Sequence, residues 1–448
     1  MINQKNSSKS ILPAPFTIAV LLTFLTIVLA LFVTEPKQKG SYFLQILSFW
    51  EQGIWNSKLL EFAIQMMLML VLGHTLALSR PINNLIFKVI KYCSNTATAA
   101  AIITFSTILV SFFNWGLGLV FGAIFARKVG EYASKNNITL NYPLIGAAGY
   151  SGMMVWHGGI SGSAPIKIAE EGHFLEEKMG VISQAETIFS NMNIIVSILL
   201  LILVPLIMYA LGKRKSGKII NLVTDEKEKK ELEEITGVEK LDHSKILASI
   251  FGGIIICYIL YKTFILPEKP SLNIITPNYI NLILFGLSIL MHQTFANFLK
   301  SIQQSIGGTS GILIQFPLYF GIMGIMNQSG LINIMSSFFV TISNEHTFPV
   351  LTFFSAGIVN IFVPSGGGQW AIQGPIIIEA IQASNFNISI EKSVMALAYG
   401  DQITNMLQPF WALPLLAITG LKAKEILPYT LILFLAGVII FSGGLILF

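Results

Sequence analysis

Charged side chains are scarce in this chain. Of its 448 residues, 11% are Asp, Glu, Lys or Arg, whereas 53% are hydrophobic. Soluble domains carry roughly a quarter charged residues, so this composition excludes an ordinary water-soluble protein. The mean hydropathy of +0.70 and the repeated apolar stretches of about 20 residues, the length that crosses a bilayer core, indicate a polytopic integral membrane protein.

Cysteine and catalytic motifs are scarce as well. Cys93 and Cys257 lie far apart, and neither has a CxxC partner or a metal-type spacing to histidine, so we expect both to be unpaired. The chain has no HExxH motif, no P-loop and no GxSxG nucleophile elbow. Lys and Arg gather in short segments between apolar stretches, which is a pattern of membrane topology and not of nucleic-acid binding.

Eight apolar stretches are long enough to cross a bilayer as single helices. They cover residues 12–34, 59–78, 142–160, 188–211, 246–266, 279–299, 306–325 and 427–447. The first is longer than the 7 to 15 apolar residues of a signal peptide, so we expect it to remain as a transmembrane helix.

Other apolar stretches are interrupted by polar and glycine-rich segments. Residues 98–126 break at NWGLG (114–118), and residues 350–383 break at PSGGGQ (364–369). Backbone groups freed by such breaks are tolerated at membrane depth only inside protein or beside a wet cavity. We therefore predict two re-entrant helical hairpins whose tips mark an interior site. Two broken helices are predicted over residues 142–165 and 389–420.

The order of these features occurs twice, in residues 12–211 and in residues 279–448. A charged loop, 212–244, and one extra span, 245–266, lie between them. An odd span between two repeats turns the second one upside down. The sequence thus predicts an all-α membrane protein built from two inverted repeats.

The distribution of charge predicts on which side of the membrane the termini and loops lie. By the positive-inside rule, residues 1–11 and the loop 212–244 are cytoplasmic, while Glu170, Glu171, Glu176 and Glu177 face outward. The loop mixes acidic residues with lysine. A solvated linker and a regulatory or partner-binding element both fit that composition.

The strongest candidate site is a polar run near the C-terminus. Asp401, Thr404, Asn405 and Gln408 are spaced so that they would share one face of a helix. A charge inside a span costs roughly 2.5 to 3.5 kcal/mol, so such residues usually face a cavity and often serve transport. We assign Asp401, Thr404 and Asn405, with Asn360, to a coupling ion, Na⁺ or H⁺, with Na⁺ placed near Asp401 and Asn405. Alternatively, Asp401 only caps a half-helix or lies at the membrane surface.

The second hairpin tip is the candidate for substrate. Three consecutive glycines let backbone N–H groups converge, and a following helix N-terminus favours a carboxylate without any Lys or Arg. A tight turn alone would also explain them. The candidate substrate-binding residues are Ser365, Gly366, Gly367, Gly368, Gln369, Asn114, Gly116, His157, Ser161 and Gln408. For His157, a hydrogen-bonded packing role stays open.

Four segments carry a likeness to known proteins: NWGLG (114–118), residues 150–163 with WHGGISGS, SGGGQW (365–370) and residues 400–414 with TNMLQPFWALP. In them the chain resembles the bacterial short-chain fatty acid transporter family, within the ion transporter superfamily of elevator-like carriers. The likeness covers nearly the whole chain except the charged loop.

The resemblance implies cation-coupled uptake of short-chain monocarboxylates such as acetoacetate or butyrate across the bacterial inner membrane. It implies no enzyme activity and no cofactor beyond the coupling ion. Hairpins and broken helices would form a moving transport domain, and the remaining spans a scaffold, with a homodimer left open.

Three alternatives stay open. A carrier of dicarboxylates or acylated amino acids would share the fold, but we would expect it to need an intramembrane Arg or Lys, and none is evident in the sequence. An intramembrane enzyme would need a nucleophile and a base. A channel would conduct ions, whereas broken, asymmetric helices favour a gated carrier.

Overall fold

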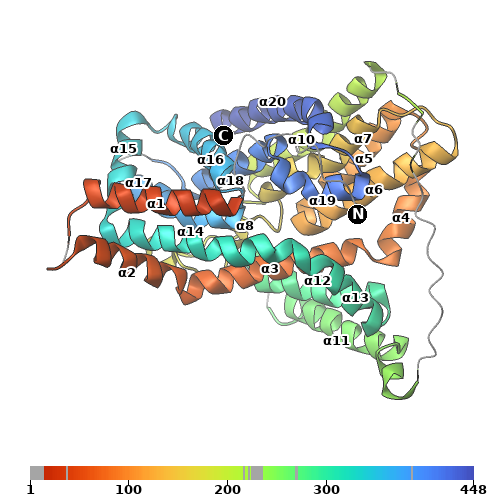
Figure 1. Ribbon diagram of the computed structural model, residues 1–448, viewed down its shortest axis with the longest axis horizontal. Coiled ribbons are helices and arrows are strands. Elements are labelled where there is room, and N and C mark those ends of the chain that lie inside the picture. Colours follow the sequence, from red (N-terminus) through yellow and green to blue (C-terminus); the bar gives the residue numbers. More distant parts are fainter. Residues whose placement is uncertain are drawn as a thin grey trace, which may run out of the picture.

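The computed structural model describes residues 15–36, 39–214, 217–219, 222, 236–267, 271–384 and 387–448. Helices dominate this part of the chain, which has no strand beyond one isolated bridge between Leu140 and Lys218 (Figure 1). Seven helical segments in it are long and apolar enough to cross a membrane. The predicted N-terminal segment 1–11 and most of the loop 212–244 lie outside the described residues.

In each half of the chain, a helical hairpin is followed by a helix that ends in 3-10 turns. The first half contains α1 (Pro15–Val33), α2 (Tyr42–Ile54), α3 (Ser57–Ala77), α4 (Arg80–Ile90), α5 (Thr96–Phe113), α6 (Trp115–Lys135), α7 (Tyr142–Tyr150), the 3-10 turns η1 (Ser151–Met154) and η2 (Trp156–Gly158), α8 (Ser163–Ile168), α9 (Glu176–Met179) and α10 (Asn191–Arg214). After η3 (Gly237–Leu241), α11 (Lys245–Phe264) and η4 (Leu272–Ile274), the second half contains α12 (Pro277–His292), α13 (Phe295–Ser305), η5 (Ile306–Thr309), α14 (Ser310–Ser329), α15 (Leu331–Ile342), α16 (Phe348–Phe362), α17 (Gly366–Ala383), α18 (Ile390–Thr404), η6 (Asn405–Leu407), α19 (Pro409–Thr419) and α20 (Ala423–Leu447).

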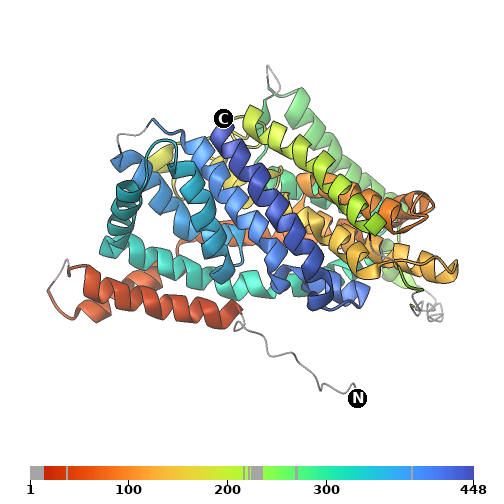
Figure 2. The ribbon, with the colours of Figure 1, turned by 90° about the horizontal axis from the view of Figure 1, so that it is seen from above.

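The two halves are interleaved. Helices α1 and α2 of the first half pack on α14 of the second, while α12 and α13 of the second half pack on α3 of the first. Figure 1 shows α1, α2 and α14 running side by side. The hairpins and broken helices pack together as a second group, α5 and α6 against α7, and α16 and α17 against α18 (Figure 2).

Backbone contacts through glycine hold this second group together. A Cβ built on Gly122 of α6 would lie 2.0 Å from the carbonyl oxygen of Gly149 on α7. A Cβ on Gly400 of α18 would lie 2.0 Å from the carbonyl oxygen of Phe353 on α16. No larger side chain fits at either place, so each hairpin and its broken helix touch directly through their backbones.

The single span predicted over residues 279–299 is wrong. Helix α12 ends at His292, Gln293 takes a left-handed conformation with φ of 65°, and Thr294 caps α13 by accepting a hydrogen bond from the Asn297 N–H at 3.2 Å. The span predicted to start at residue 306 begins with a 3-10 turn, and α14 starts at Ser310. The helix ends here because a run of polar residues includes a threonine that caps the next helix. Apolar content alone predicted that the helix would continue.

Both cysteines are free thiols, as predicted. Cys257 is exposed on α11, whose apolar side chains mostly face outward, and Cys93 is buried after α4. Burial raises the pKa of the Cys93 thiol to about 12, so this thiol is unreactive at neutral pH.

Candidate functional site

The two hairpin tips are built as capped helix N-termini. Asn114 separates α5 from α6, and its Oδ1 accepts a hydrogen bond from the Leu117 N–H at 2.7 Å. Ser365 precedes α17, and its Oγ accepts from the Gly368 N–H at 3.3 Å. These side chains satisfy N–H groups that a helix start leaves unpaired, and therefore hold the tips in place.

The first tip is fixed from two further sides. Ser161, in the broken helix, accepts a hydrogen bond from the Trp115 N–H at 3.0 Å. A Cβ on Gly116 would lie 3.1 Å from the backbone of Leu70 on α3. The tip thus contacts both the broken helix and the α3 layer.

The glycines of the second tip lie against the centre of the molecule. A Cβ on Gly366 would lie 2.8 Å from the His157 ring and 3.1 Å from Asp401 Oδ2, and one on Gly367 would lie 3.0 Å from the Phe62 ring. A Cβ on Gly368 would meet an aromatic ring of α14 at 2.5 Å. These three positions are glycine because neighbouring groups already occupy the space that a Cβ atom would need.

His157 and Asp401 form a buried pair beside this tip. His157 Nδ1 lies 2.5 Å from Asp401 Oδ2, and the Ala164 N–H donates to His157 Nε2 at 3.0 Å. Because Nε2 is an acceptor, the ring proton belongs on Nδ1 and is donated to Asp401. Trp156 stacks on the imidazole with a centroid separation of 4.5 Å. Asp401 Oδ1 has no hydrogen-bond partner among the described residues.

Asn360 of α16 gathers the polar residues that follow Asp401. Its Nδ2 lies 2.7 Å from the Asp401 carbonyl oxygen, 2.8 Å from Thr404 Oγ1 and 3.1 Å from Asn405 Oδ1. Gln408 Nε2 donates to the Asn360 carbonyl oxygen at 2.6 Å. Helix α18 ends at Thr404 and Gln408 is extended, so these residues do not share one continuous helical face as predicted. Their contacts with Asn360 bring them together instead.

Oxygen acceptors are in surplus around this cluster. Besides Asp401 Oδ1, the side-chain carbonyl oxygens of Asn360, Gln369 and Gln408 are buried and have no partner in the described structure. Gln369 donates instead, through Nε2, to the Ala356 carbonyl oxygen at 2.8 Å. Carboxylate, amide and hydroxyl oxygens are ligands that hard cations take. The described residues contain no group of three or more His, Cys, Asp or Glu side chains suited to a metal ion.

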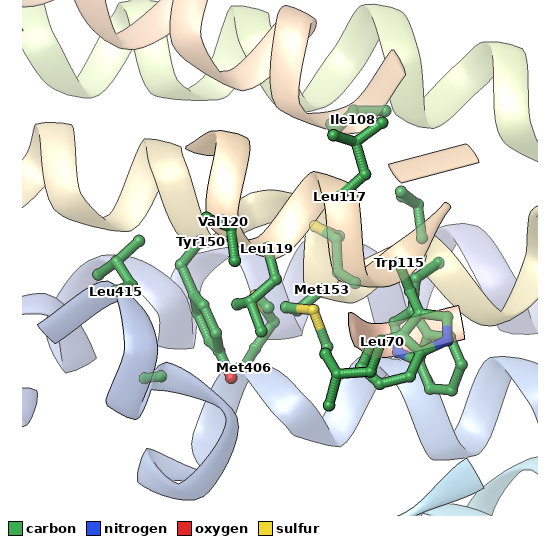
Figure 3. Packing of buried hydrophobic residues seen from close by; sticks show 14 of the residues in the cluster. Leu70, Ile108, Trp115, Leu117, Leu119, Val120, Tyr150, Met153, Met406 and Leu415 are labelled. Carbon is green, nitrogen blue, oxygen red and sulfur yellow. The ribbon is translucent and has the colours of Figure 1, made fainter. Parts of the chain in front are cut away.

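A narrow cavity lies between the hairpin tips and the α3 and α14 helices. Its volume is about 10 Å³, roughly the room for one water molecule. It is lined by Met66, Trp115, Met153, Trp156, Ser163, Ile312, Phe316, Ser365, Gly366, Gly367 and Trp411. Figure 3 shows Trp115 and Met153 within the surrounding buried cluster. Of the predicted substrate-binding residues, only Ser365, Gly366 and Gly367 line it.

Sequence reasoning missed the tryptophans of this cavity. Trp115 and Trp156 each stand next to a residue that was selected, Asn114 and His157. Their indole N–H groups are buried without a partner in the described part of the chain. The sequence signal that could have found them is a tryptophan, whose indole N–H needs an acceptor when buried, next to a break in a helix.

A buried lysine was also missed. Lys167 Nζ lies 2.6 Å from Glu170 Oε2 and 3.2 Å from Gln65 Oε1 on α3, while Gln65 Nε2 donates to Glu170 Oε1 at 2.8 Å. Glu170, which the positive-inside rule predicts on the outer side of the membrane, is buried within the protein and 9% exposed. No local pattern indicates that Lys167 is buried, because it lies three positions before its partner, a spacing common on exposed helices. Its charge is balanced within the protein.

Membrane-length helices, capped hairpins and a buried polar centre are features of a membrane transporter. Two solved structures share this fold: the Alcanivorax borkumensis YdaH transporter, with a TM-score of 0.59 over 96% of this chain and 98% of that one, and Neisseria gonorrhoeae MtrF, described as one of a class of antimetabolite efflux pumps, with 0.55 over 97% and 95%. Each is 14% identical to this chain, so the likeness concerns the fold alone.

Sequence comparison identifies the family. The model of the short chain fatty acid transporter family matches residues 3–448. A protein of Escherichia coli K12 is 38% identical over 98% of this chain and 96% of its own length, and one of Haemophilus influenzae Rd is 36% identical over 96% and 95%. Both bear the name "Putative short-chain fatty acid transporter". The chain belongs to the short-chain fatty acid transporter family, and is a transporter and not an enzyme.

Proposed function

We propose that this protein takes up short-chain monocarboxylates of the acetoacetate and butyrate type by symport with a cation. One observation carries the proposal: the start of α17 lies between the apolar cavity and Asp401. The unpaired N–H groups and positive potential of a helix N-terminus suit a carboxylate. The carboxylate of Asp401 suits a cation, so the two ligands would bind on opposite sides of Gly366.

The coupling ion would bind near Asp401 and the residues around Asn360. The unpaired oxygens of Asp401 and Asn360 favour Na⁺, while the hydrogen bond between His157 and Asp401 provides a group that could carry a proton. A cation there would offset the charge of Asp401 beside the incoming carboxylate, and would thereby raise the affinity for substrate.

We further propose two inverted repeats and an elevator-like movement. The recurring order of elements and the reciprocal packing of α1 and α2 on α14 and of α12 and α13 on α3 support an inverted pseudosymmetry. The glycine contacts within the hairpin group support its movement as one body. The N-terminus would be cytoplasmic, the membrane the bacterial inner membrane, and the scaffold the surface for a homodimer.

The test is uptake of radiolabelled butyrate into proteoliposomes under a Na⁺ gradient or a proton gradient imposed separately. Accumulation driven by one gradient would support the proposal and name the ion, and Asp401→Asn should abolish that accumulation while the protein still inserts. Concentrative uptake by Asp401→Asn at the normal rate would refute the role of Asp401. No accumulation under either gradient would refute butyrate symport and direct the search to dicarboxylates and acylated amino acids.

A further inference from the structure

We propose that the indole N–H groups of Trp115 and Trp156 bind the substrate carboxylate, and that Ile312 and Phe316 set the longest acyl chain that the carrier accepts. This inference rests on the proposed function, because it assigns recognition and selectivity to side chains of the same cavity.

The two indole N–H groups are buried donors without acceptors. Trp115 is 4% exposed and Trp156 is 3% exposed, both line the cavity, and neither Nε1 has a hydrogen-bond partner among the described residues. Buried donors normally have an acceptor, because a donor buried without one loses its hydrogen bond to water and gains none in the protein. Two such donors on one cavity indicate a ligand that brings acceptors.

Ring packing holds these indoles in place. The centroid of Trp115 lies 5.7 Å from that of Trp156 and 5.6 Å from that of Trp411, and Trp156 stacks on His157. The position of each donor is therefore set before any ligand arrives, so little ordering is needed on binding.

The donor set selects a single carboxylate. Indole nitrogen donates and cannot accept, so it suits an anionic oxygen and not a cation, as do the unpaired N–H groups of Gly366 and Gly367 at the start of the 18-residue α17. Among the described residues, no charged side chain lines the cavity. The nearby Lys167 is neutralised by Glu170, so a second carboxylate would find no counter-charge.

The α14 wall faces this donor set. Ile312 and Phe316 are four positions apart on α14, and thus lie on the same face of the helix. Phe316 is buried and packs against the rings of Phe62 and Phe320, at centroid distances of 6.4 and 5.7 Å. The cavity of about 10 Å³ has to widen to admit an acid, and this wall yields less than Met66 and Met153, which also line the cavity. The wall therefore limits how far an acyl chain extends from the carboxylate.

Counterflow of radiolabelled butyrate in proteoliposomes, with equal ion concentrations on both sides, tests the donors. We expect Trp115→Phe and Trp156→Phe, which keep an aromatic ring, each to raise the half-saturating butyrate concentration by about tenfold or more, the loss typical of a hydrogen bond to a charged group. The matched control is Trp370→Phe, because Trp370 is buried with an unpaired Nε1 but lies outside the cavity. It should leave that concentration unchanged.

An unchanged butyrate affinity in both Trp115→Phe and Trp156→Phe would overturn this inference and leave the proposed function intact. Absence of butyrate counterflow in the wild-type carrier would instead overturn the proposed function itself. Loss of affinity in Trp370→Phe equal to that of the two cavity variants would assign the effect to general packing and would also overturn the inference.

Competition by unlabelled linear acids of increasing length tests the wall. Ile312→Ala should move the best competitor to a longer acid and raise the preference for hexanoate over butyrate by about tenfold, a typical effect of one or two methylenes. Phe316→Leu should act in the same direction. Ile314→Ala is the control, because Ile314 lies on the same helix but is 53% exposed. An unaltered length profile in Ile312→Ala and Phe316→Leu would refute the α14 wall.

Discussion

Lys167 and Glu170 form a buried ion pair. We expect neutralising either residue alone to destabilise the protein, and by different amounts. Their charged atoms are 2.6 Å apart, and the Lys167 side chain is 2% exposed whereas that of Glu170 is 12% exposed. Breaking a buried pair costs about 3 to 5 kcal/mol, because one charge stays behind without a partner. The cost of each variant therefore depends on which charge remains.

Glu170→Gln leaves the positive charge of Lys167, the more deeply buried of the two, without a counter-charge. Lys167 would keep neutral contacts, the Gln65 oxygen at 3.2 Å, the Phe62 ring at 5.5 Å and the new amide oxygen, but would lose its counter-charge, so we expect a loss of about 5 kcal/mol. Lys167→Met leaves Glu170 with amide donors from Gln65 at 2.8 Å and Asn278 at 3.2 Å, so we expect about 3 kcal/mol. The double variant leaves no charge and should lose less than either single one.

Equilibrium unfolding in mixed detergent micelles, followed by circular dichroism, measures these losses. The informative quantity is the interaction energy of the double-mutant cycle, which should be negative and several kcal/mol in size if the two charges act as a pair. A double variant whose loss equals the sum of the single losses would refute the reasoning, and so would a larger loss for Lys167→Met than for Glu170→Gln.

Three further outcomes are expected. Gly400→Ala should prevent correct assembly, because its Cβ would lie 2.0 Å from a backbone oxygen of α16. A Cβ on Gly253 would meet no atom of the described residues within 4 Å, so Gly253→Ala should behave as wild type in size-exclusion chromatography. Equal behaviour of the two variants would contradict the contact. Asn114→Ala should lower stability by about 1 kcal/mol through loss of the α6 cap, whereas Asn114→Ser should recover part of it in thermal unfolding. His173 Nε2 lies 3.0 Å from the Gly180 carbonyl oxygen, and burial lowers the pKa of His173. The loop 173–180 should therefore be fully stable above about pH 6.5 and lose stability as pH falls towards that lowered pKa. Hydrogen exchange at residues 173–180 that is equally slow at pH 7.5 and 5.5, after correction for intrinsic rates, would disprove this.

The sequence predicted most spans and both breaks because length, apolar content and capping residues are local properties. Asn114 and Ser365 are recognisable as caps from their own neighbourhoods. The failures arose where a polar run stopped an apolar stretch, at Gln293, and where the 13-residue α2 was too short and too mixed to count as a span. Helix α2 is stabilised by packing on α14, which no local pattern reports.

The candidate site was less accessible to sequence reasoning. His157 and Asp401 were each selected, but for separate roles, since their pairing spans 244 positions and depends on how the two halves interleave. Helical periodicity placed Asp401 and Gln408 on one face, although the helix ends between them and Asn360 supplies the connection. Lys167 was not selected, because its burial and its contact with Gln65 on α3 come from tertiary packing.

The glycine contacts at Gly122 and Gly400 have a mechanical consequence. Where two backbones touch, no rotamer change is available to absorb a displacement, so shear between those helices meets stiff resistance. The methionine side of the cavity is softer, because Met66 and Met153 adapt their shape readily. A displacement is therefore taken up mainly by these two side chains, while the backbone contacts within the hairpin group stay rigid.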